Sequence, residues 1–171
     1  APGKPGRLEF RNLAVDEKAL GGKATRKQVT LVVGNRGKEV EMELLVYLPN
    51  DVPRPAPVFL GLNFYGNQTV HADPAIRLHK SWVRNSEKFG ITENRATEAS
   101  RGVREHRWPV EAILDGGYGL ATMYYGDIDP DFDDGFQNGV HPLFYEPGQQ
   151  EPKPDEWASI AAWAWGLGRA M

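Results

Sequence analysis

The sequence of 171 residues contains no cysteine. There is therefore no disulfide framework, no thiolate nucleophile and no metal site built on sulfur ligands. Histidine is scarce as well, and the four histidines show neither a helical i, i+4 pair nor the flanking glutamate of a zinc protease. We therefore expect no metal ion, and we expect no cofactor.

Strong charge imbalance and long apolar runs are also missing. The 20 lysine and arginine residues face 23 acidic ones, which leaves a net charge of −3 at pH 7. Such a balance offers no basic field for nucleic acid. The longest apolar runs, such as residues 44–48 and 160–167, are too short to cross a bilayer. We therefore expect neither a nucleic-acid nor a membrane partner.

Credible nucleophiles are absent too. The only serines are Ser81, Ser86, Ser100 and Ser159, and none of them lies in a G-x-S-x-G motif. The isolated histidines are more typical of exposed or hydrogen-bonded side chains than of a general base. No residue of this chain is therefore expected to act as a catalytic nucleophile, acid or base.

The first sixty or so residues are instead rich in β-formers. Residues 7–16 (RLEFRNLAVD), 28–33 (QVTLVV) and 40–48 (VEMELLVYL) partly alternate polar and apolar positions, which predicts strands. Residues 34–38 (GNRGK) suit a hairpin turn. The continuous apolar run at 58–64 (VFLGLNF) is typical of a central strand covered on both faces.

The remainder alternates helices and strands. Residues 108–117 predict a helix with Pro109 in its first turn, and residues 119–127 predict the next strand. A last helix is expected over residues 155–171, with Asp155 at its start. It is apolar on nearly all sides, so we expect it to be buried on nearly all sides, by protein beyond this chain. The order predicts an α/β fold with a mixed sheet.

Between the strand predicted at residues 58–64 and the helix predicted at residues 108–117, residues 66–106 form a polar segment without sustained periodicity. We interpret it as an insertion with one short helix near residues 74–82. Long loops of this kind are usually functional or mobile. Its many arginines and lysines favour an anionic substrate, although a solvated loop would have the same composition.

The strand-end segment GLNFYGN holds most of the candidate ligand-binding residues. Ligands of open α/β sheets bind beyond the carboxyl ends of strands. Gly66 permits close backbone approach there, and Asn63 and Asn67 offer amide donors. The alternative is an ordinary turn that closes a strand. Tyr65 and Trp82 are the aromatic candidates for stacking on a sugar ring, although such residues more often anchor a core or a loop.

Residues 127–135 (DIDPDFDDG) form an acidic loop whose alternating carboxylates would suit calcium. The glycine is misplaced for an EF-hand, however, and no glutamate occupies the twelfth position. A solvated loop is the better interpretation, with Asp127 capping or hydrogen-bonding the backbone.

Three segments, residues 61–70, 107–140 and 155–171, resemble bacterial glucuronoyl esterases of carbohydrate esterase family 15. The resemblance implies a three-layer α/β/α hydrolase fold that is incomplete in this chain. Residues 1–171 would be the N-terminal part of one catalytic domain, and residues 66–106 an insertion bordering the cleft. In such hydrolases the loop after the equivalent strand supplies a backbone N–H to the oxyanion hole.

The resemblance also implies a function. It is serine-type hydrolysis of the ester between 4-O-methyl-glucuronic acid on xylan and lignin alcohols, in a secreted or periplasmic enzyme. The serine, the acidic residue and the histidine would follow Met171, so the partners are this substrate and the remainder of the enzyme. Residues 1–171 alone are then expected to be inactive and poorly folded. An acetyl xylan esterase and a non-catalytic carbohydrate-binding module are the alternatives.

Overall fold

A mixed five-stranded sheet forms the centre of the computed structural model, which describes residues 2–53 and 55–171. Its strand order is β1-β2-β3-β5-β4. The strands are β1 (Arg7–Ala19), β2 (Ala24–Asn35), β3 (Lys38–Pro49), β4 (Val58–Asn63) and β5 (Gly119–Tyr124). The first three pair antiparallel, β3 pairs antiparallel with β5, and β5 pairs parallel with β4. The predicted mixed α/β sheet is therefore confirmed.

The hairpin between β2 and β3 forms where the turn chemistry predicts it. Asn35 pairs with Lys38, so the loop has two residues. Both of them, Arg36 and Gly37, have positive φ angles of 51° and 80°. This backbone matches the twist of the flanking strands, and glycine adopts it without strain.

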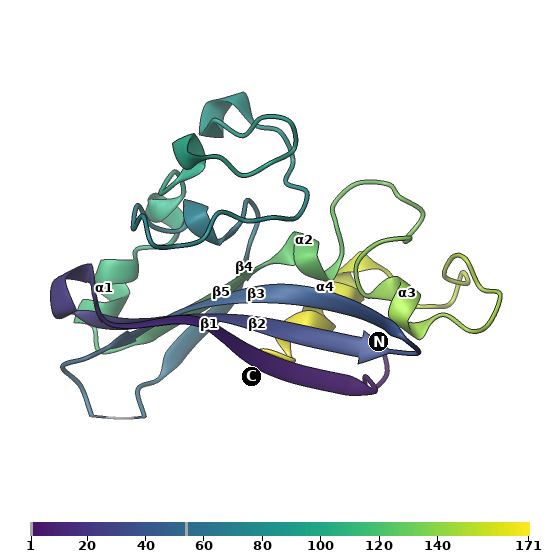
Figure 1. The fold of residues 1–171 in the computed structure, drawn as a ribbon, viewed down its shortest axis with the longest axis horizontal. Helices are drawn as coiled ribbons and strands as arrows, with labels where there is room; N and C mark the ends of the chain where they lie inside the picture. The colour runs from purple at the N-terminus through teal and green to yellow at the C-terminus, as the bar shows by residue number, and fades with distance from the viewer. Residues whose placement is uncertain (1, 54) are drawn as a thin grey trace.

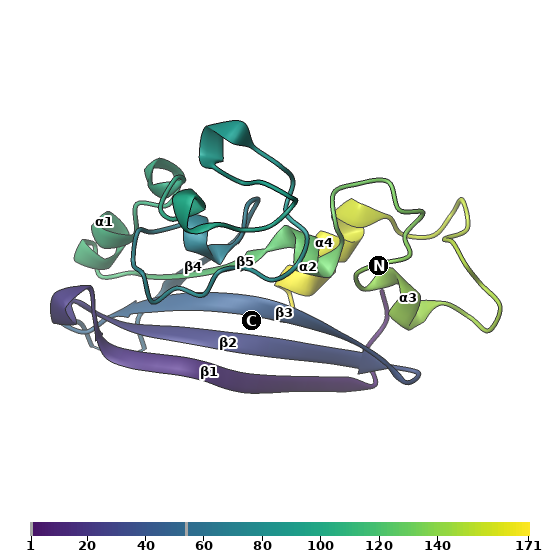
Figure 2. The ribbon, with the colours of Figure 1, turned by 45° about the horizontal axis from the view of Figure 1, so that its top comes forward.

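The apolar residues of the sheet lie on both of its faces. On β3, Leu44 packs with Ala162 and Trp165 on one face, while its neighbour Leu45 packs with Val110 and Leu114 on the other. Alternate residues of a strand point to opposite faces. Helices therefore cover both faces and the molecule has three layers, with β1 to β3 as the long ribbon in Figures 1 and 2.

Strand β4 differs from its prediction. The apolar run was expected to form a central strand, but β5 inserts between β3 and β4 and leaves β4 at the edge of the described sheet. Val58 and Phe59 are consequently 42% and 55% exposed. The fully buried strand is β5.

The helices are α1 (Val110–Asp115), α2 (Tyr125–Ile128), α3 (His141–Phe144) and α4 (Ser159–Leu167). The two predicted helices are shorter at both ends than expected, and the strand predicted over residues 119–127 is shorter at its end. Pro109 precedes the first turn of α1, and β5 ends at Tyr124 because the chain turns directly into α2. Asp155 does not cap α4, which begins four residues later after Ala158.

Helix α4 is buried along one face only. Ala162, Trp165 and Gly166 are buried, and Gly166 lies so close to Ile128 that an added Cβ would come within 2.6 Å of its side chain. Ile160, in contrast, is 79% exposed. The expected burial on nearly all sides is thus not found within the described residues, because nothing in them covers the outer stripe. No helix among them is long and apolar enough to span a membrane.

The predicted short helix near residues 74–82 is wrong. Residues 74–82 contain turns and bends but no helix. The 3-10 turns of the insertion lie before and after them, and Asn67–Thr69, Glu87–Phe89 and Glu98–Ser100 are three of these turns. These turns make up the teal lobe above the sheet in Figure 1.

A buried polar contact ties this lobe to the sheet. Asp73 pairs with the guanidinium of Arg26 on β2 and accepts a 2.8 Å hydrogen bond from the hydroxyl of Tyr47 on β3. Burial would raise the pKa of Asp73, but the Ala75 N–H, the Tyr47 hydroxyl and Arg26 together lower it. The insertion is therefore anchored on the sheet by an ionised carboxylate.

Candidate functional site

The carboxyl ends of β4 and β5 lie level with each other, because Asn63 pairs with Tyr124 at the last register position. The chain leaves β4 into the loop 64–67 and leaves β5 into α2. Between these exits lies a pocket of about 260 Å³, here called the strand-end pocket. It is lined by Phe64, Tyr65, Arg84, Arg104, Tyr125 and Asp131. Such a position is where open α/β sheets bind ligands.

The amides of Asn63 and Asn67 build the loop of this pocket. Asn63 Oδ1 accepts a 2.9 Å hydrogen bond from the Gly66 N–H, and its Nδ2 donates to Asn67 Oδ1 at 2.7 Å. Asn67 in turn donates to the Glu43 carbonyl of β3 at 2.9 Å. Both side chains are buried. Their amide donors are thus engaged within the protein, so these residues shape the loop.

Gly66 supplies the backbone conformation that the loop requires. Its φ and ψ angles of 93° and 155° lie in a region that is essentially restricted to glycine. An added Cβ would lie 2.5 Å from Gln68 Oε1 and 2.9 Å from His79 Cβ. Gln68 is itself buried and donates to the Tyr65 carbonyl at 2.8 Å. The position of Tyr65 therefore depends on close packing behind Gly66.

Two arginines line the strand-end pocket, and they differ in their interaction partners. Arg84 donates to Asp131 at 3.1 Å, and Tyr125 also donates to that carboxylate, at 2.9 Å. Arg104 instead places its guanidinium over the rings of Tyr65 and Phe89, 5.6 and 5.1 Å from their centroids. No carboxylate within residues 2–53 and 55–171 forms an ion pair with Arg104. It is a cation held by aromatic faces and available to an anion.

A buried histidine–carboxylate pair supports the loop from behind. His79 Nε2 lies 2.7 Å from Asp127 Oδ1, and that oxygen also accepts a 2.8 Å hydrogen bond from the Ser81 hydroxyl. The other carboxylate oxygen accepts the Glu43 N–H at 3.1 Å. Because Asp127 lies between Ser81 and His79, the three residues do not form a relay in which histidine activates the serine. The expected backbone contact of Asp127 is confirmed.

The charge of this pair follows from its surroundings. Burial lowers the pKa of His79, but the adjacent Asp127 carboxylate, aided by Glu43, outweighs burial and raises it. The sequence pattern predicted an isolated histidine at position 79. No local signal connects it with Asp127, because 48 residues separate them.

A second buried pair joins Asp129, which follows α2, to His141, which begins α3. His141 Nδ1 is 3.0 Å from Asp129 Oδ1, and its ring stacks on Trp157 with centroids 4.1 Å apart. Asp129 is therefore part of the core, and the expectation of a solvated loop is wrong at this residue. Within the described ranges no group of three or more histidine, cysteine or acidic side chains is placed to hold a metal ion.

The raised pKa of His79 predicts a pH dependence of stability. A group whose pKa is higher in the folded than in the unfolded state stabilises the fold fully below its unfolded pKa of about 6.5. That contribution is lost as the pH rises through the folded pKa. We expect the free energy of unfolding to fall across this window, and to fall less in His79→Gln. Urea unfolding of the unaltered protein and of His79→Gln from pH 5 to 9 measures this pH dependence. If the free energy of unfolding falls equally with pH in both proteins, the pH dependence does not come from His79.

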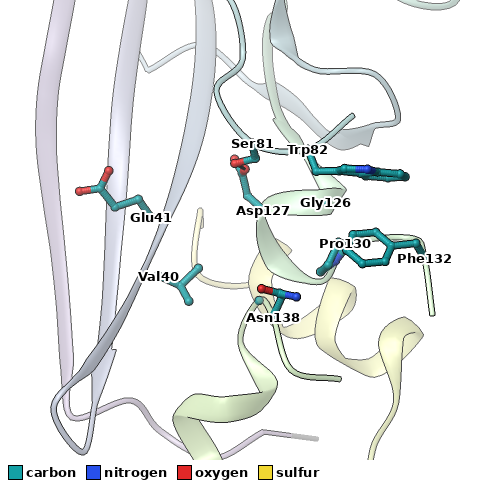
Figure 3. Close-up of a pocket in the computed structure, with 10 residues that line it drawn as sticks. Val40, Glu41, Ser81, Trp82, Gly126, Asp127, Pro130, Phe132 and Asn138 are labelled. Carbon is teal, nitrogen blue, oxygen red and sulfur yellow. Dashed lines mark hydrogen bonds between the residues drawn. The ribbon is translucent and has the colours of Figure 1, made fainter. Parts of the chain in front are cut away.

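The structure brings four of the five candidates together and leaves one apart. Asn63, Tyr65, Gly66 and Asn67 all form the strand-end loop. Trp82 lies instead in a neighbouring cavity of about 380 Å³, here called the Trp82 pocket and shown in Figure 3. It is lined by Val40, Glu41, Ser81, Trp82, Gly126, Asp127, Pro130, Phe132, Asn138 and Gly139. The sequence alone does not indicate this separation.

A mixed sheet of this order, covered on both faces and with a pocket at its strand ends, defines part of an α/β-hydrolase fold. No family model matches the chain. Carbohydrate esterase MZ0003 from an unknown prokaryotic organism is 51% identical over 158 residues, which are 92% of this chain and 36% of that protein.

Solved structures agree with this relationship. A glucuronoyl esterase from Solibacter usitatus superimposes with a TM-score of 0.86 and 46% identity, over 99% of this chain and 42% of the other. A promiscuous CE15 esterase from a marine bacterial metagenome gives a TM-score of 0.79 and 48% identity, with the same coverage. The chain is therefore a homologue of the CE15 glucuronoyl esterases, and it spans about two fifths of the length of these relatives.

Proposed function

We propose that this chain is the N-terminal part of a serine-type esterase that hydrolyses 4-O-methyl-glucuronoyl esters between xylan and lignin alcohols. The observation that carries the proposal is the strand-end pocket, with its hydrogen-bonded loop and with Arg104, which forms no ion pair with the residues that the structure describes. The identities of 46–51% to named carbohydrate and glucuronoyl esterases support it. A secreted or periplasmic location would suit a polymeric plant substrate.

The chemistry of the ester explains why a cation belongs at this site. The carboxyl group of the bound ester is neutral, so the substrate itself needs no counter-charge. Negative charge develops on the carbonyl oxygen in the tetrahedral intermediate, and it reappears on the released uronate. A preorganised cation or N–H donor stabilises such charge without reorganisation. Arg104 and the fixed loop are the groups of this chain that can do so.

The remaining catalytic groups are proposed to lie outside these residues. A serine nucleophile, a histidine base and an acidic residue following Met171 would form the acyl-enzyme and release it to water. This chain then contributes the sheet, the strand-end loop and part of the cleft wall.

The proposal is tested by the substrate preference of the complete parent protein. We expect hydrolysis of benzyl glucuronate with a higher kcat/KM than that of acetylated xylose. A preference for the acetyl ester would assign the protein to the acetyl xylan esterases. Failure to cleave either ester, in a preparation that melts cooperatively, would favour a non-catalytic carbohydrate-binding role.

The role of Arg104 gives a second test. In Arg104→Gln we expect kcat/KM for benzyl glucuronate to fall by about tenfold, equivalent to about 1.4 kcal/mol of lost transition-state stabilisation. Arg107→Gln is the matched control, because it removes the same charge three residues further along the chain, at an exposed position outside the pocket. Equal losses in both variants would show that net charge alone matters.

A further inference from the structure

The Trp82 pocket differs from the strand-end pocket in its chemistry. Trp82 and Phe132 form one wall, with ring centroids 4.7 Å apart. Phe132 remains 41% exposed, so its ring is accessible to a ligand. Figure 3 shows the Trp82 and Phe132 rings to one side of Ser81 and Asp127, with Asn138 below. A cavity of about 380 Å³ with few polar groups is of the size that binds small ligands.

Its charge argues against an anionic ligand. None of the residues that line the cavity is a lysine or an arginine, and the carboxylates of Glu41 and Asp127 pair with Arg11 and His79. A uronate carboxylate would therefore find no free cation here, whereas in the strand-end pocket it meets Arg84 and Arg104. Aromatic faces beside carboxylate and amide groups instead suit a neutral sugar ring, which has apolar C–H faces and a rim of hydroxyl donors.

The two pockets are linked along the acidic loop. A third concavity, about 410 Å³, shares Arg84 and Asp131 with the strand-end pocket and shares Pro130 and Phe132 with the Trp82 pocket. The three cavities therefore lie side by side along the acidic loop, and this row of cavities is here called the groove. Such a row fits a chain of several sugar units better than it fits a single small ester.

We propose that the Trp82 pocket is a subsite for a neutral pyranose ring of the glycan, reached through this groove from the strand-end pocket. The proposal deepens, and rests on, the proposed esterase function, because the strand-end pocket is where the ester would lie. Trp82 and Phe132 contact the faces of the sugar ring, and the side-chain amide of Asn138 forms a hydrogen bond with one of its hydroxyls.

The test measures binding of xylotetraose, a neutral probe without an ester, to the complete parent protein by isothermal titration calorimetry. We expect Phe132→Ala to weaken binding by about tenfold or more. Trp82→Phe, which keeps a ring, is expected to weaken it less than Trp82→Ala. Phe10→Ala is the matched control, because Phe10 is an exposed aromatic residue of β1 and lines none of the three cavities.

The possible outcomes separate the two proposals. Absence of xylotetraose binding to the unaltered protein overturns the subsite, whatever esters the protein cleaves. Equal affinities in Phe132→Ala and Phe10→Ala also overturn it, provided that both variants melt at the temperature of the unaltered protein. If xylotetraose binding depends on the rings of Trp82 and Phe132 but the protein does not hydrolyse benzyl glucuronate, the sugar subsite is supported and the proposed esterase function is contradicted. If free glucuronate binds at Trp82 more tightly than xylotetraose does, the Trp82 pocket prefers an anionic ligand, and the proposal of a neutral sugar is wrong.

Discussion

Replacement of Asp127 by alanine is expected to lower the free energy of unfolding by about 3–5 kcal/mol, as is typical when one partner of a buried charged pair is removed. Asp127 is 5% exposed, and His79 beside it is 4% exposed. The substitution leaves the histidine without its counter-ion in a medium that disfavours charge. It also removes the acceptor for the Ser81 hydroxyl and for the Glu43 N–H.

The loss is large because Asp127 joins three parts of the molecule. His79 and Ser81 belong to the insertion, Glu43 belongs to β3, and Asp127 itself belongs to α2. A single carboxylate therefore fixes the insertion and the start of the acidic loop to the sheet. We expect the insertion to become protease-sensitive in Asp127→Ala before the sheet unfolds, since local opening precedes global unfolding where contacts are few.

The measurement is urea unfolding at pH 6, followed by tryptophan fluorescence. Asp133→Ala is the control, because Asp133 is an exposed carboxylate of the same loop, and surface changes of this kind usually stay within about 0.5 kcal/mol. Asp127→Asn separates charge from hydrogen bonding, since it retains acceptor capacity at one oxygen only. If Asp127→Ala is no less stable than Asp133→Ala, the pair contributes nothing to the fold.

Local patterns predict those parts of this molecule that depend on neighbouring residues. The hairpin at Arg36 and Gly37 follows from turn chemistry, and the strand-end loop follows from an apolar run that ends in Asn and Gly. The grouping of Asn63 with Asn67 is likewise local, because four residues separate them. Sequence reasoning therefore locates most of the candidate site.

Contacts between distant segments are not predictable in this way. The pairing of His79 with Asp127 and the meeting of Trp82 with Phe132 both depend on how a 41-residue insertion, residues 66–106, folds back over the sheet. The insertion has no periodicity to reveal its path, since it is built from short 3-10 turns held by side-chain hydrogen bonds. The amide donors of Asn63 were predicted to face a ligand, yet burial makes them hold the loop.

In the complete parent protein, Gly66→Ala is expected to reduce kcat/KM for benzyl glucuronate by about a hundredfold, the loss that a displacement of about 1 Å at a reacting site can cause. The backbone conformation at Gly66 costs a residue with a Cβ about 1–3 kcal/mol. The Cβ would also lie 2.5 Å from Gln68 Oε1, and 2.9 Å from His79 Cβ, which is buried. The loop must therefore shift, and Tyr65 and the overlying Arg104 shift with it.

Gly37→Ala distinguishes a displaced loop from a merely less stable protein. Gly37 also has a positive φ, 80°, but an added Cβ would meet no atom within 4 Å, and the hairpin turn lies outside the strand-end pocket. Both variants bear backbone strain, whereas only Gly66→Ala adds a clash at the candidate site. We expect Gly37→Ala to lose stability and keep its activity at temperatures where it is folded, and Gly66→Ala to lose activity even when folded. If the two variants have comparable activity per folded molecule, the shape of the Asn63–Asn67 loop does not control the chemistry. In that case the protein relieves the clash at Gly66 without moving a group that the reaction uses.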